Sequence, residues 1–365
     1  MKVPFIDLQL RYQQERDEIL RCLDNVLAKG HLVLTQEVAE FEQAVSEYIK
    51  VANVVALNSG TDALMMALWA LGVGKGDEVI TTPVSFVAST GAICHVGARP
   101  VYVDIGEDFN IDASKIEPAI TERTKAIMPV HWGGRIADMS TILEIANKYN
   151  IPVIEDAAQA MGSFYKGTHG GALGTVSAFS AHPLKNLNAI GDAGFLATAD
   201  DSIAEKVRLY RNHGLSSRDN CVFYGVNSRL DSLQAEILKY RLQRLEDVVN
   251  CRRENVAIYR RNLAVKEIKI PDEYDHEKNS YVMFLLQAES RDKLKEYLNS
   301  KGIESLVYYG TPLHLHQAAN RLGYTKGSFP VAEAHCEKVL ALPHHQNLDR
   351  SQIEYVCREI NNFYH

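Results

Sequence analysis

The stretch NVVALNSGTDALMMALWAL, residues 53–71, predicts the fold of the chain. Its first five residues form a short apolar run typical of a buried strand. The segment NSGTD (58–62) then leads into a helical pattern that begins at Asp62 and ends at Leu71, with Leu64 and Leu68 at helical spacing. A strand followed at once by a helix is one half of the unit that builds parallel sheets.

The same alternation continues toward residue 198. Further apolar runs are EVITT (78–82), RPVYV (99–103), KAIMPV (125–130), IPVIED (151–156), VSAFS (176–180) and GFLAT (194–198). Near-continuous apolar strands alternating with helices are typical of a mostly parallel sheet covered on both faces, so the fold class predicted is a three-layer α/β/α domain. The last two runs follow each other without a helix and predict a hairpin or an antiparallel edge.

The flanking segments complete the domain organisation. Thr35 is a candidate N-cap for the helical pattern that follows it, and a long helical pattern over 231–263 bridges to the C-terminal part. Beyond it the pattern changes to that of a small α+β domain. We expect a large domain over 1–245 and a small one over 246–365, the latter with strands at 280–286 and 304–309 and helices at 291–300 and 330–340.

The composition narrows the class of protein. The chain has 365 residues, 46% of them hydrophobic and 23% charged, which excludes disordered, collagenous and disulfide-scaffold proteins. Its net charge of −7 disfavours a nucleic-acid partner. The six cysteines form no Cys-x-x-Cys pair, the N-terminus shows no apolar leader and no apolar stretch is long enough for a membrane span. A reduced, cytoplasmic location is the expectation.

Polar residues that follow the apolar runs are the candidates for chemistry, because ligands of open parallel sheets bind beyond the carboxyl ends of the strands. The segment NSGTD before a helix can bind an anion, Asp156 ends one strand, and Lys185 follows another. Each alone is consistent with a helix cap, a surface carboxylate or a solvated amine. Together they match pyridoxal phosphate, which needs N–H donors, a carboxylate at its ring nitrogen and a lysine for its aldehyde. Neither Gly-x-Gly-x-x-Gly nor a Walker motif is present.

At this point the sequence resembles a known family along essentially its whole length. It is similar to the DegT/DnrJ/EryC1/StrS sugar aminotransferases, which are fold-type I pyridoxal-phosphate enzymes with an aspartate-aminotransferase-like fold. The matching motifs, in order, are PFIDL (4–8), NSGTDAL (58–64), GDEVITTPVSFVAS (76–89), PVYVDI (100–105), IPVIEDAAQAMGS (151–163), HPLKNLNAIGDAG (182–194), GVNSRLDSLQAEIL (225–238), TPLHLHQ (311–317) and ALPHH (341–345).

The resemblance implies a role for each matching residue. Lys185 would be the catalytic lysine, which holds the cofactor as a Schiff base and moves the proton. The other implied cofactor contacts are Asp156 at the pyridine nitrogen, Gln159 at the ring hydroxyl, Gly60, Thr61 and Ser180 at the phosphate, and Phe86 stacked on the ring. Asn227 would reach the phosphate of the neighbouring subunit's cofactor, which implies a homodimer with shared active sites.

Substrate contacts are less sharply indicated. His314, Tyr308 and His182 are candidates, as is Arg229, for which a structural salt bridge is an equal alternative. The pairs His314/His316 and His344/His345 resemble metal ligands, but neither is accompanied by acidic ligands at helical spacing, so no metal is predicted.

The implied reaction is transamination of a nucleotide-linked keto-deoxysugar, with L-glutamate as amino donor and pyridoxamine phosphate as the second form of the cofactor. Gly191-Asp192 resembles members that act on 3-keto rather than 4-keto sugars. The segment His131–Arg135 departs from the family pattern and keeps open a smaller, non-nucleotide keto acceptor. A sugar dehydratase using the same cofactor is disfavoured because those members commonly carry His at the position of Lys185. A non-catalytic regulatory homologue and a nicotinamide-dependent nucleotide-sugar dehydratase are the remaining alternatives.

Overall fold

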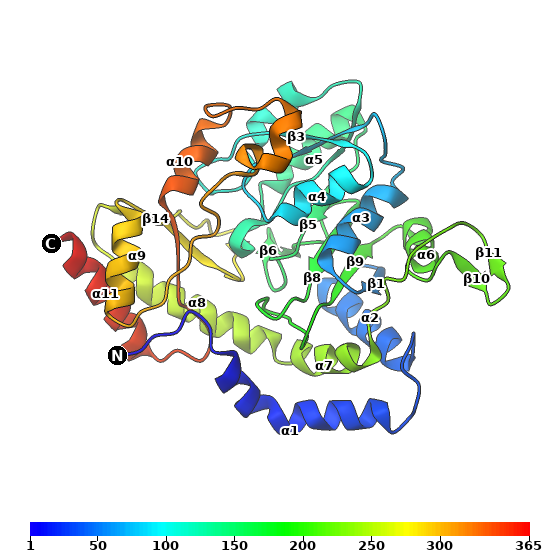
Figure 1. Ribbon diagram of the computed structural model, residues 1–365, viewed down its shortest axis with the longest axis horizontal. Coiled ribbons are helices and arrows are strands. Elements are labelled where there is room, and N and C mark those ends of the chain that lie inside the picture. The colour runs from blue at the N-terminus through cyan, green and yellow to red at the C-terminus, as the bar shows by residue number, and fades with distance from the viewer.

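The computed structural model, which describes residues 1–365, is built around a seven-stranded sheet (Figure 1). Its order is β3-β2-β4-β5-β8-β9-β1, with β4 and β5 joined by isolated parallel bridges and every strand except β9 parallel to the rest. The bounds are β1 Asn53–Leu57, β2 Glu78–Thr81, β3 Arg99–Tyr102, β4 Thr124–Ile127, β5 Ile154–Asp156, β8 Val176–Ser180 and β9 Gly194–Thr198.

The antiparallel partner expected at the end of this series is present, but it is not an edge. β9 pairs with β8 on one side and with β1 on the other, so β1 is the edge strand. All five residues of β9 are buried. An apolar run buried on both faces suits an interior strand, and the sequence alone does not reveal which distant strand supplies the second neighbour.

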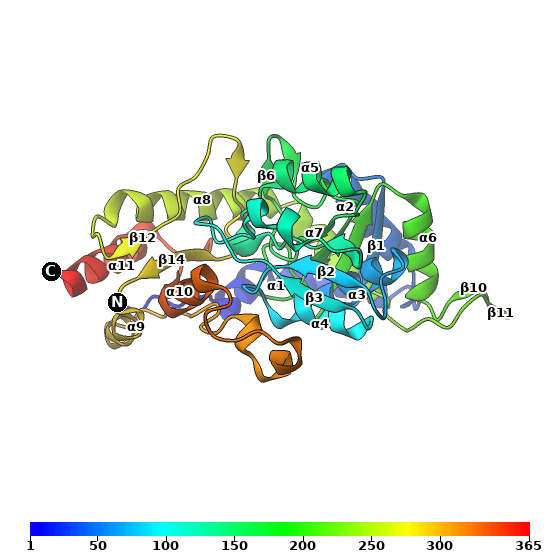
Figure 2. The ribbon, with the colours of Figure 1, turned by 90° about the horizontal axis from the view of Figure 1, so that it is seen from above.

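Helices cover both faces of this sheet, which confirms the predicted three-layer α/β/α arrangement (Figure 2). The layers follow from alternation along each strand: in β1, Val54 and Ala56 join one core, whereas Val55 and Leu57 join the other. The first core is packed by α2 (Gln36–Ile49), α5 (Met139–Tyr149) and α7 (Ser232–Leu242), and the second by α3 (Gly60–Ala70), α4 (Val87–His95) and α6 (Asp201–Tyr210).

Two long helices border the layers. Helix α1 (Leu8–Leu27) begins at Asp7, whose side chain accepts a hydrogen bond from the Leu10 N–H at 2.8 Å, and lies along α7 (Figure 1). The single helix predicted over 231–263 is in fact two, because the backbone departs from helical geometry at Arg244 before α8 (Leu245–Asn262) begins. Thr35 precedes α2 as predicted, although its hydroxyl bonds to the Ser232 hydroxyl and not to the helix N-terminus.

The C-terminal part holds a second, three-stranded antiparallel sheet of β12 (Ile268–Lys269), β14 (Phe284–Ala288) and β15 (Val339–Leu342). Helix α9 (Arg291–Ser300) matches its prediction, and α10 (Pro330–Lys338) and α11 (Arg350–Tyr364) follow. Three predictions are wrong in detail. The strand predicted over 280–286 is β14, which begins at Phe284 and ends at Ala288. Residues 304–309 form only a single bridge, Leu306 to Ala341, and the helix predicted over 330–340 ends at Lys338, where its apolar tail becomes β15.

The remaining elements are short. They are a small sheet of β6 (Phe164–Tyr165), β7 (Thr168–His169) and β13 (Glu277–Lys278), a projecting hairpin of β10 (Leu215–Ser217) and β11 (Asn220–Cys221), and the 3₁₀ turns Ala113–Lys115, Glu117–Ala119, Trp132–Gly134, Leu313–Leu315 and Gln317–Leu322 (Figures 1 and 2). No helix combines the length and the apolar character that crossing a bilayer requires.

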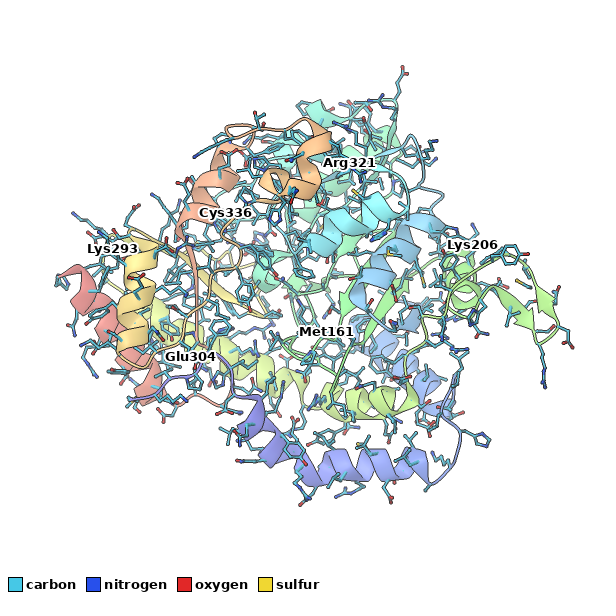
Figure 3. All side chains as sticks on the ribbon, in the orientation of Figure 1. Met161, Lys206, Lys293, Glu304, Arg321 and Cys336 are labelled. Atoms are coloured by element: carbon cyan, nitrogen blue, oxygen red, sulfur yellow. The ribbon has the colours of Figure 1, made fainter.

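The N-terminal residues pack far from their sequence neighbours. Val3 is fully buried in the core formed by α8, α9, α11, β14 and β15, and it bridges to Ile303. The Phe5 N–H donates to Glu304 Oε2 at 2.9 Å, and Glu304 lies beside this segment in Figure 3. The first residues therefore share a core with the C-terminal part, and the division of the chain at residue 245 stays a prediction.

Candidate active site

A cavity of about 470 Å³ lies at the carboxyl ends of the parallel strands, between the large sheet and the C-terminal part of the chain. It is lined by residues that follow β1, β5 and β8, together with Phe5, Ile6, Arg252, Val282, Met283, Tyr309, His344 and His345. The residues predicted from the sequence that line it are Gly60, Thr61, Phe86, Asp156, Gln159, Ser180, His182, Lys185 and Tyr308. Segments more than 100 residues apart thus meet around one volume.

Asp156 is a buried carboxylate that forms no ion pair with any side chain. It ends β5 and is 4% exposed. Ser89 Oγ donates to its Oδ2 at 2.6 Å, and the Ala158 N–H donates to its Oδ1 at 3.3 Å. Burial raises the pKa of Asp156 above its usual value, and these two hydrogen bonds offset only part of the shift. A cationic group placed against this carboxylate would stabilise its ionised form.

Lys185 places an amine in the same cavity, and the amine has no hydrogen-bond partner. Loss of solvation lowers the pKa of Lys185 to about 8, although the charge of Asp156 acts in the opposite direction. At neutral pH a larger fraction of this amine is uncharged than for a solvated lysine, and the uncharged amine is the form that attacks a carbonyl. His182 lines the cavity nearby, and its pKa is lowered by burial and by the charge of Lys185.

Gln159 is oriented by the backbone of a neighbouring turn. The Gly133 N–H donates to Gln159 Oε1 at 2.7 Å, which fixes the amide so that its NH₂ group is free to donate. The side chain is 6% exposed and lines the cavity. This geometry suits a hydrogen bond to an oxygen acceptor on a ligand.

The N-terminus of α3 forms a cradle suited to an anion. Ser59 caps the helix by accepting from the Asp62 N–H at 3.1 Å, while Gly60 and Thr61 begin it. A Cβ on Gly60 would lie 2.8 Å from Ser180 Cβ and 3.2 Å from the Phe179 carbonyl oxygen, so only glycine allows this close approach of α3 to β8. Free N–H groups and the helix dipole favour a phosphate there.

The residue before Asp156 has a different environment. Glu155 is fully buried on β5, where His131 Nε2 lies 2.8 Å from its Oε2 and the N–H groups of Gly171 and Leu173 donate to its two oxygens at 2.7 and 2.8 Å. Burial alone would raise the pKa of Glu155, but the hydrogen bonds lower it overall. Every oxygen of Glu155 is therefore used inside the protein, and nothing in the sequence pattern distinguished it from Asp156.

Three predicted residues lie away from the cavity of their own chain. Asn227 is exposed at the surface, and Arg229 Nη1 donates to Asn212 Oδ1 at 2.9 Å. His314 is buried, with its Nε2 2.9 Å from Glu333 Oε1. Their roles stay predictions.

None of the residues of the segment His131–Arg135, whose sequence departs from the family pattern, lines the active-site cavity. Arg135 Nη2 lies 2.9 Å from Glu277 Oε2, and Trp132 is 3% exposed beside Tyr309. Both side chains border a separate, smaller cavity. The smaller acceptor that this segment keeps open stays a prediction.

Several residues that line the cavity are not predicted as site residues from the sequence, among them Ser89, Arg252, Tyr309, His344 and His345. In the sequence the dipeptide His344-His345 resembles only a pair of metal ligands. Its position directly after the apolar run VLALP (339–343) was the available signal, because that run ends a strand. Arg252 sits within a charged helical pattern, where no sequence signal separated it from its neighbours.

Known proteins match the chain over its whole length. Residues 13–361 match the model of the DegT/DnrJ/EryC1/StrS aminotransferase family. A pleiotropic regulatory protein of Geobacillus stearothermophilus is 42% identical over 100% of this chain and 99% of its own, and a UDP-2-acetamido-2-deoxy-3-oxo-D-glucuronate aminotransferase of Pseudomonas aeruginosa is 37% identical over 99% and 100%. The solved structure of DesV from S. venezuelae, in complex with a ketimine intermediate, superimposes with a TM-score of 0.97 at 38% identity and covers 99% of this chain and 98% of its own.

The site fits the cofactor of that family. The uncompensated carboxylate of Asp156, the unpartnered amine of Lys185 and the glycine-dependent cradle at Gly60 match the ring nitrogen, aldehyde and phosphate of pyridoxal phosphate. The chain belongs to the DegT/DnrJ/EryC1/StrS aminotransferase family and is a pyridoxal-phosphate-dependent aminotransferase.

Proposed function

We propose that the enzyme transfers the amino group of L-glutamate to the C3 keto group of a nucleotide-linked sugar. The observation that carries the proposal is the placement of the Lys185 amine with Asp156 in one cavity large enough for a sugar substrate. The name of the Pseudomonas aeruginosa relative specifies a 3-oxo sugar linked to UDP, which supports the choice of position and of nucleotide linkage. Asp192, on which the 3-keto preference rests, also lines the cavity.

Pyridoxal phosphate supplies a conjugated ring that accepts electrons from the substrate carbon being deprotonated. The task of the protein is to move the proton. We assign this task to Lys185, whose amine would hold the cofactor and, once free, would carry a proton between Cα of the amino donor and the cofactor's C4′ carbon. A pKa near 8 suits both directions, because the amine accepts and returns a proton close to neutral pH.

Three groups would hold the ring. Asp156 would pair with the protonated pyridine nitrogen and so keep it positive, while Ser89 fixes the orientation of the carboxylate. The free NH₂ group of Gln159 would donate to the ring oxygen. Phe86 is 52% exposed with its ring centroid 6.0 Å from that of Tyr309, which leaves an aromatic face for stacking on the cofactor.

The phosphate would bind at the N-terminus of α3, held by Gly60, Thr61 and the Ser180 hydroxyl. We place the sugar beside His182 and Tyr308, which line the rest of the cavity. The Leu184 N–H donates to His182 Nδ1 at 3.3 Å, so the proton of the neutral ring is on Nε2, where it can reach a sugar hydroxyl.

We further propose a homodimer in which Asn227 completes the partner's phosphate site. Asn227 is exposed and follows the projecting β10–β11 hairpin, on a segment where Tyr224 is 97% exposed (Figure 1). An aromatic side chain left in water on a projecting arm is typical of a surface that a second subunit covers. Arg229 would hold this arm through Asn212. The cytoplasmic location stays a prediction.

The first test is the absorbance spectrum of the purified protein with pyridoxal phosphate, before and after L-glutamate. We expect a visible band from the lysine-bound cofactor and its replacement by the absorbance of pyridoxamine phosphate. Lys185→Ala should lose multiple-turnover transfer. A band that glutamate leaves unchanged would overturn the choice of donor. Absence of any lysine-bound band would contradict the role of Lys185.

The second test identifies the acceptor. Enzyme converted to the pyridoxamine form is mixed with 3-keto and 4-keto nucleotide sugars and with small keto compounds, and return of the original band is measured. We expect the 3-keto nucleotide sugars to react fastest. A faster reaction of 4-keto sugars or of small keto compounds would contradict the proposal. The regulatory alternative, which the name of the Geobacillus stearothermophilus relative keeps open, predicts cofactor binding without turnover of any acceptor.

A further inference from the structure

We propose that Arg252 and His345 form a binding site for a substrate carboxylate within the active-site cavity. The inference rests on the proposed function in one respect, since it supposes that an amino-acid donor or an acidic sugar enters this cavity. The two residues come from α8 and from the segment after β15, and both line the cavity.

Arg252 uses only one of its three nitrogens inside the protein. Its Nη1 donates to the carbonyl oxygens of Tyr281 and Val282 at 3.1 and 3.2 Å. Its Nε is buried without a partner and its Nη2 makes no hydrogen bond, although the residue is only 3% exposed. Nε and Nη2 form the edge of the guanidinium that binds the two oxygens of a carboxylate side by side.

His345 offers a second unused donor. The Asn347 N–H donates to its Nδ1 at 3.3 Å, so the proton of the neutral ring is on Nε2. That nitrogen is buried and forms no hydrogen bond of normal geometry, although the Pro4 carbonyl is close enough to raise the pKa of the ring, and the residue is 5% exposed. A buried N–H that is poorly satisfied is costly, and an arriving carboxylate would accept its hydrogen bond.

The surrounding charges leave Arg252 without a counter-ion. Glu15 serves three other arginines: Arg241 at 2.7 Å, Arg11 at 3.7 Å and Arg244 at 4.0 Å. Arg252 forms no ion pair, and burial together with the charge of Arg11 lowers its pKa to about 9. A buried, unpaired cation is retained at a cost, which argues for a ligand that supplies the missing negative charge.

The neighbouring Arg253 shows what a purely structural arginine on this helix does. Its Nε donates to the Asn279 carbonyl at 2.9 Å and its Nη2 to the Gly162 carbonyl at 2.8 Å, and it does not line the cavity. Like Arg252 it ties α8 to the segment before β14. Substitution of Arg253 is therefore a matched control for the loss of hydrogen bonds between an arginine of α8 and backbone carbonyls.

The test measures binding to the enzyme loaded with pyridoxal phosphate by titration calorimetry, so turnover is not required. The probes are glutarate, which has the carboxylates of glutamate without its amine, and the pair UDP-glucuronate and UDP-glucose. For Arg252→Gln we expect at least a tenfold weaker binding of one carboxylate probe, because a hydrogen-bonded charge pair is lost. Arg253→Gln should leave all three affinities within about twofold.

The outcomes separate the two sources of the carboxylate. Weaker glutarate binding assigns the site to the amino donor, whereas weaker UDP-glucuronate binding with unchanged UDP-glucose binding assigns it to the sugar. Unchanged binding of every probe would overturn the site. Equal weakening of both UDP-sugars would also overturn it, because the diphosphate would then be the group bound.

A second variant covers a failure of Arg252→Gln to fold. His345→Asn removes the Nε2 donor without touching the Tyr281 and Val282 carbonyls, and should weaken the same probe several-fold. Retention of the visible band of the bound cofactor shows in each variant that the rest of the site is intact. Absence of that band in the wild-type protein would instead contradict the proposed function.

Discussion

Glu155 and Asp156 are adjacent carboxylates on β5, both buried, and they have opposite environments. The oxygens of Glu155 are saturated by His131 and by the N–H groups of the turn after β7, and its pKa is lowered. Asp156 receives one hydroxyl and one N–H, and burial raises its pKa. One side of the strand therefore uses its acid to hold the fold, while the other keeps hydrogen-bonding capacity for a ligand.

The largest effect expected from this difference is on activity. Asp156→Asn should lower kcat/KM about a hundredfold or more, because the positive charge of the ring nitrogen loses its partner. The thermal stability of the cofactor-free protein should not fall. The raised pKa means that the folded state binds a proton more readily than the unfolded chain, so ionised Asp156 costs stability as pH rises through that pKa.

Measurement of kcat/KM and of the melting temperature without cofactor, above pH 6, checks this prediction. A variant that keeps its activity but melts earlier would reverse the roles assigned to the two acids. Asn keeps the size of the side chain, so packing is conserved in this comparison.

The next effect is on stability. Glu155→Gln should lower the free energy of unfolding by about 3 kcal/mol, because an amide cannot accept all the hydrogen bonds that the carboxylate accepts and leaves buried donors unpaired. Urea unfolding of the cofactor-free protein measures it. The stability that wild-type Glu155 contributes should be lost as pH falls through its lowered pKa. If Glu155→Gln unfolds like the wild type but binds pyridoxal phosphate poorly, Glu155 serves the ligand and not the fold.

The pH dependence of cofactor binding tests the ligand-binding role of Asp156. The rate at which cofactor-free enzyme captures pyridoxal phosphate should rise with pH and level off above about pH 8, following the uncharged amine of Lys185. Below that value the rate should fall about tenfold for each pH unit. Stopped-flow absorbance measures the rate. Substitution of Lys166, an exposed lysine, is the control and should leave the pH profile unchanged. In Asp156→Asn the midpoint should move lower, because the carboxylate that favours the charged amine is gone.

The smallest effect concerns the hydroxyl that orients Asp156. Ser89→Ala removes the donor at 2.6 Å from Oδ2 and should reduce kcat severalfold with little change in KM for the acceptor. Steady-state kinetics with both substrates measures the split. An unchanged kcat would mean that the Ser89 hydroxyl is not required to orient the Asp156 carboxylate toward the cofactor ring.

Much of this arrangement could be predicted from the sequence because it depends on local pattern. The run NVVAL forms β1 at its predicted bounds, and the residues after β1, β5 and β8 meet in one cavity because parallel strands end at the same edge. The resemblance to a family then assigned roles to residues that geometry alone leaves equivalent, such as Gln159.

The features that could not be predicted from the sequence depend on contacts between residues far apart in the chain. The interior place of β9 is decided by pairing with β1, about 140 residues away, and the run VLAL fits a helix end as well as a strand until β14 is beside it. Arg252 and His345 reach the cavity only through the packing of α8 against the C-terminal segments. The different fates of Glu155 and Asp156 follow from which face of β5 each occupies, and the apolar run around them does not reveal it.

The placement of Val3, Phe5 and Ile6 also has a consequence for biosynthesis. Ribosomes make these residues before α9, α11 and β15, yet Val3 is buried by those elements, and Phe5 and Ile6 line the cavity. Their partners emerge some 300 residues later, so this contact closes a very long loop and forms only after those partners have been made. A nascent chain stalled before residue 303 has all the strands of the large sheet, but it lacks one wall of the pocket, so catalytic competence is gained only after that point.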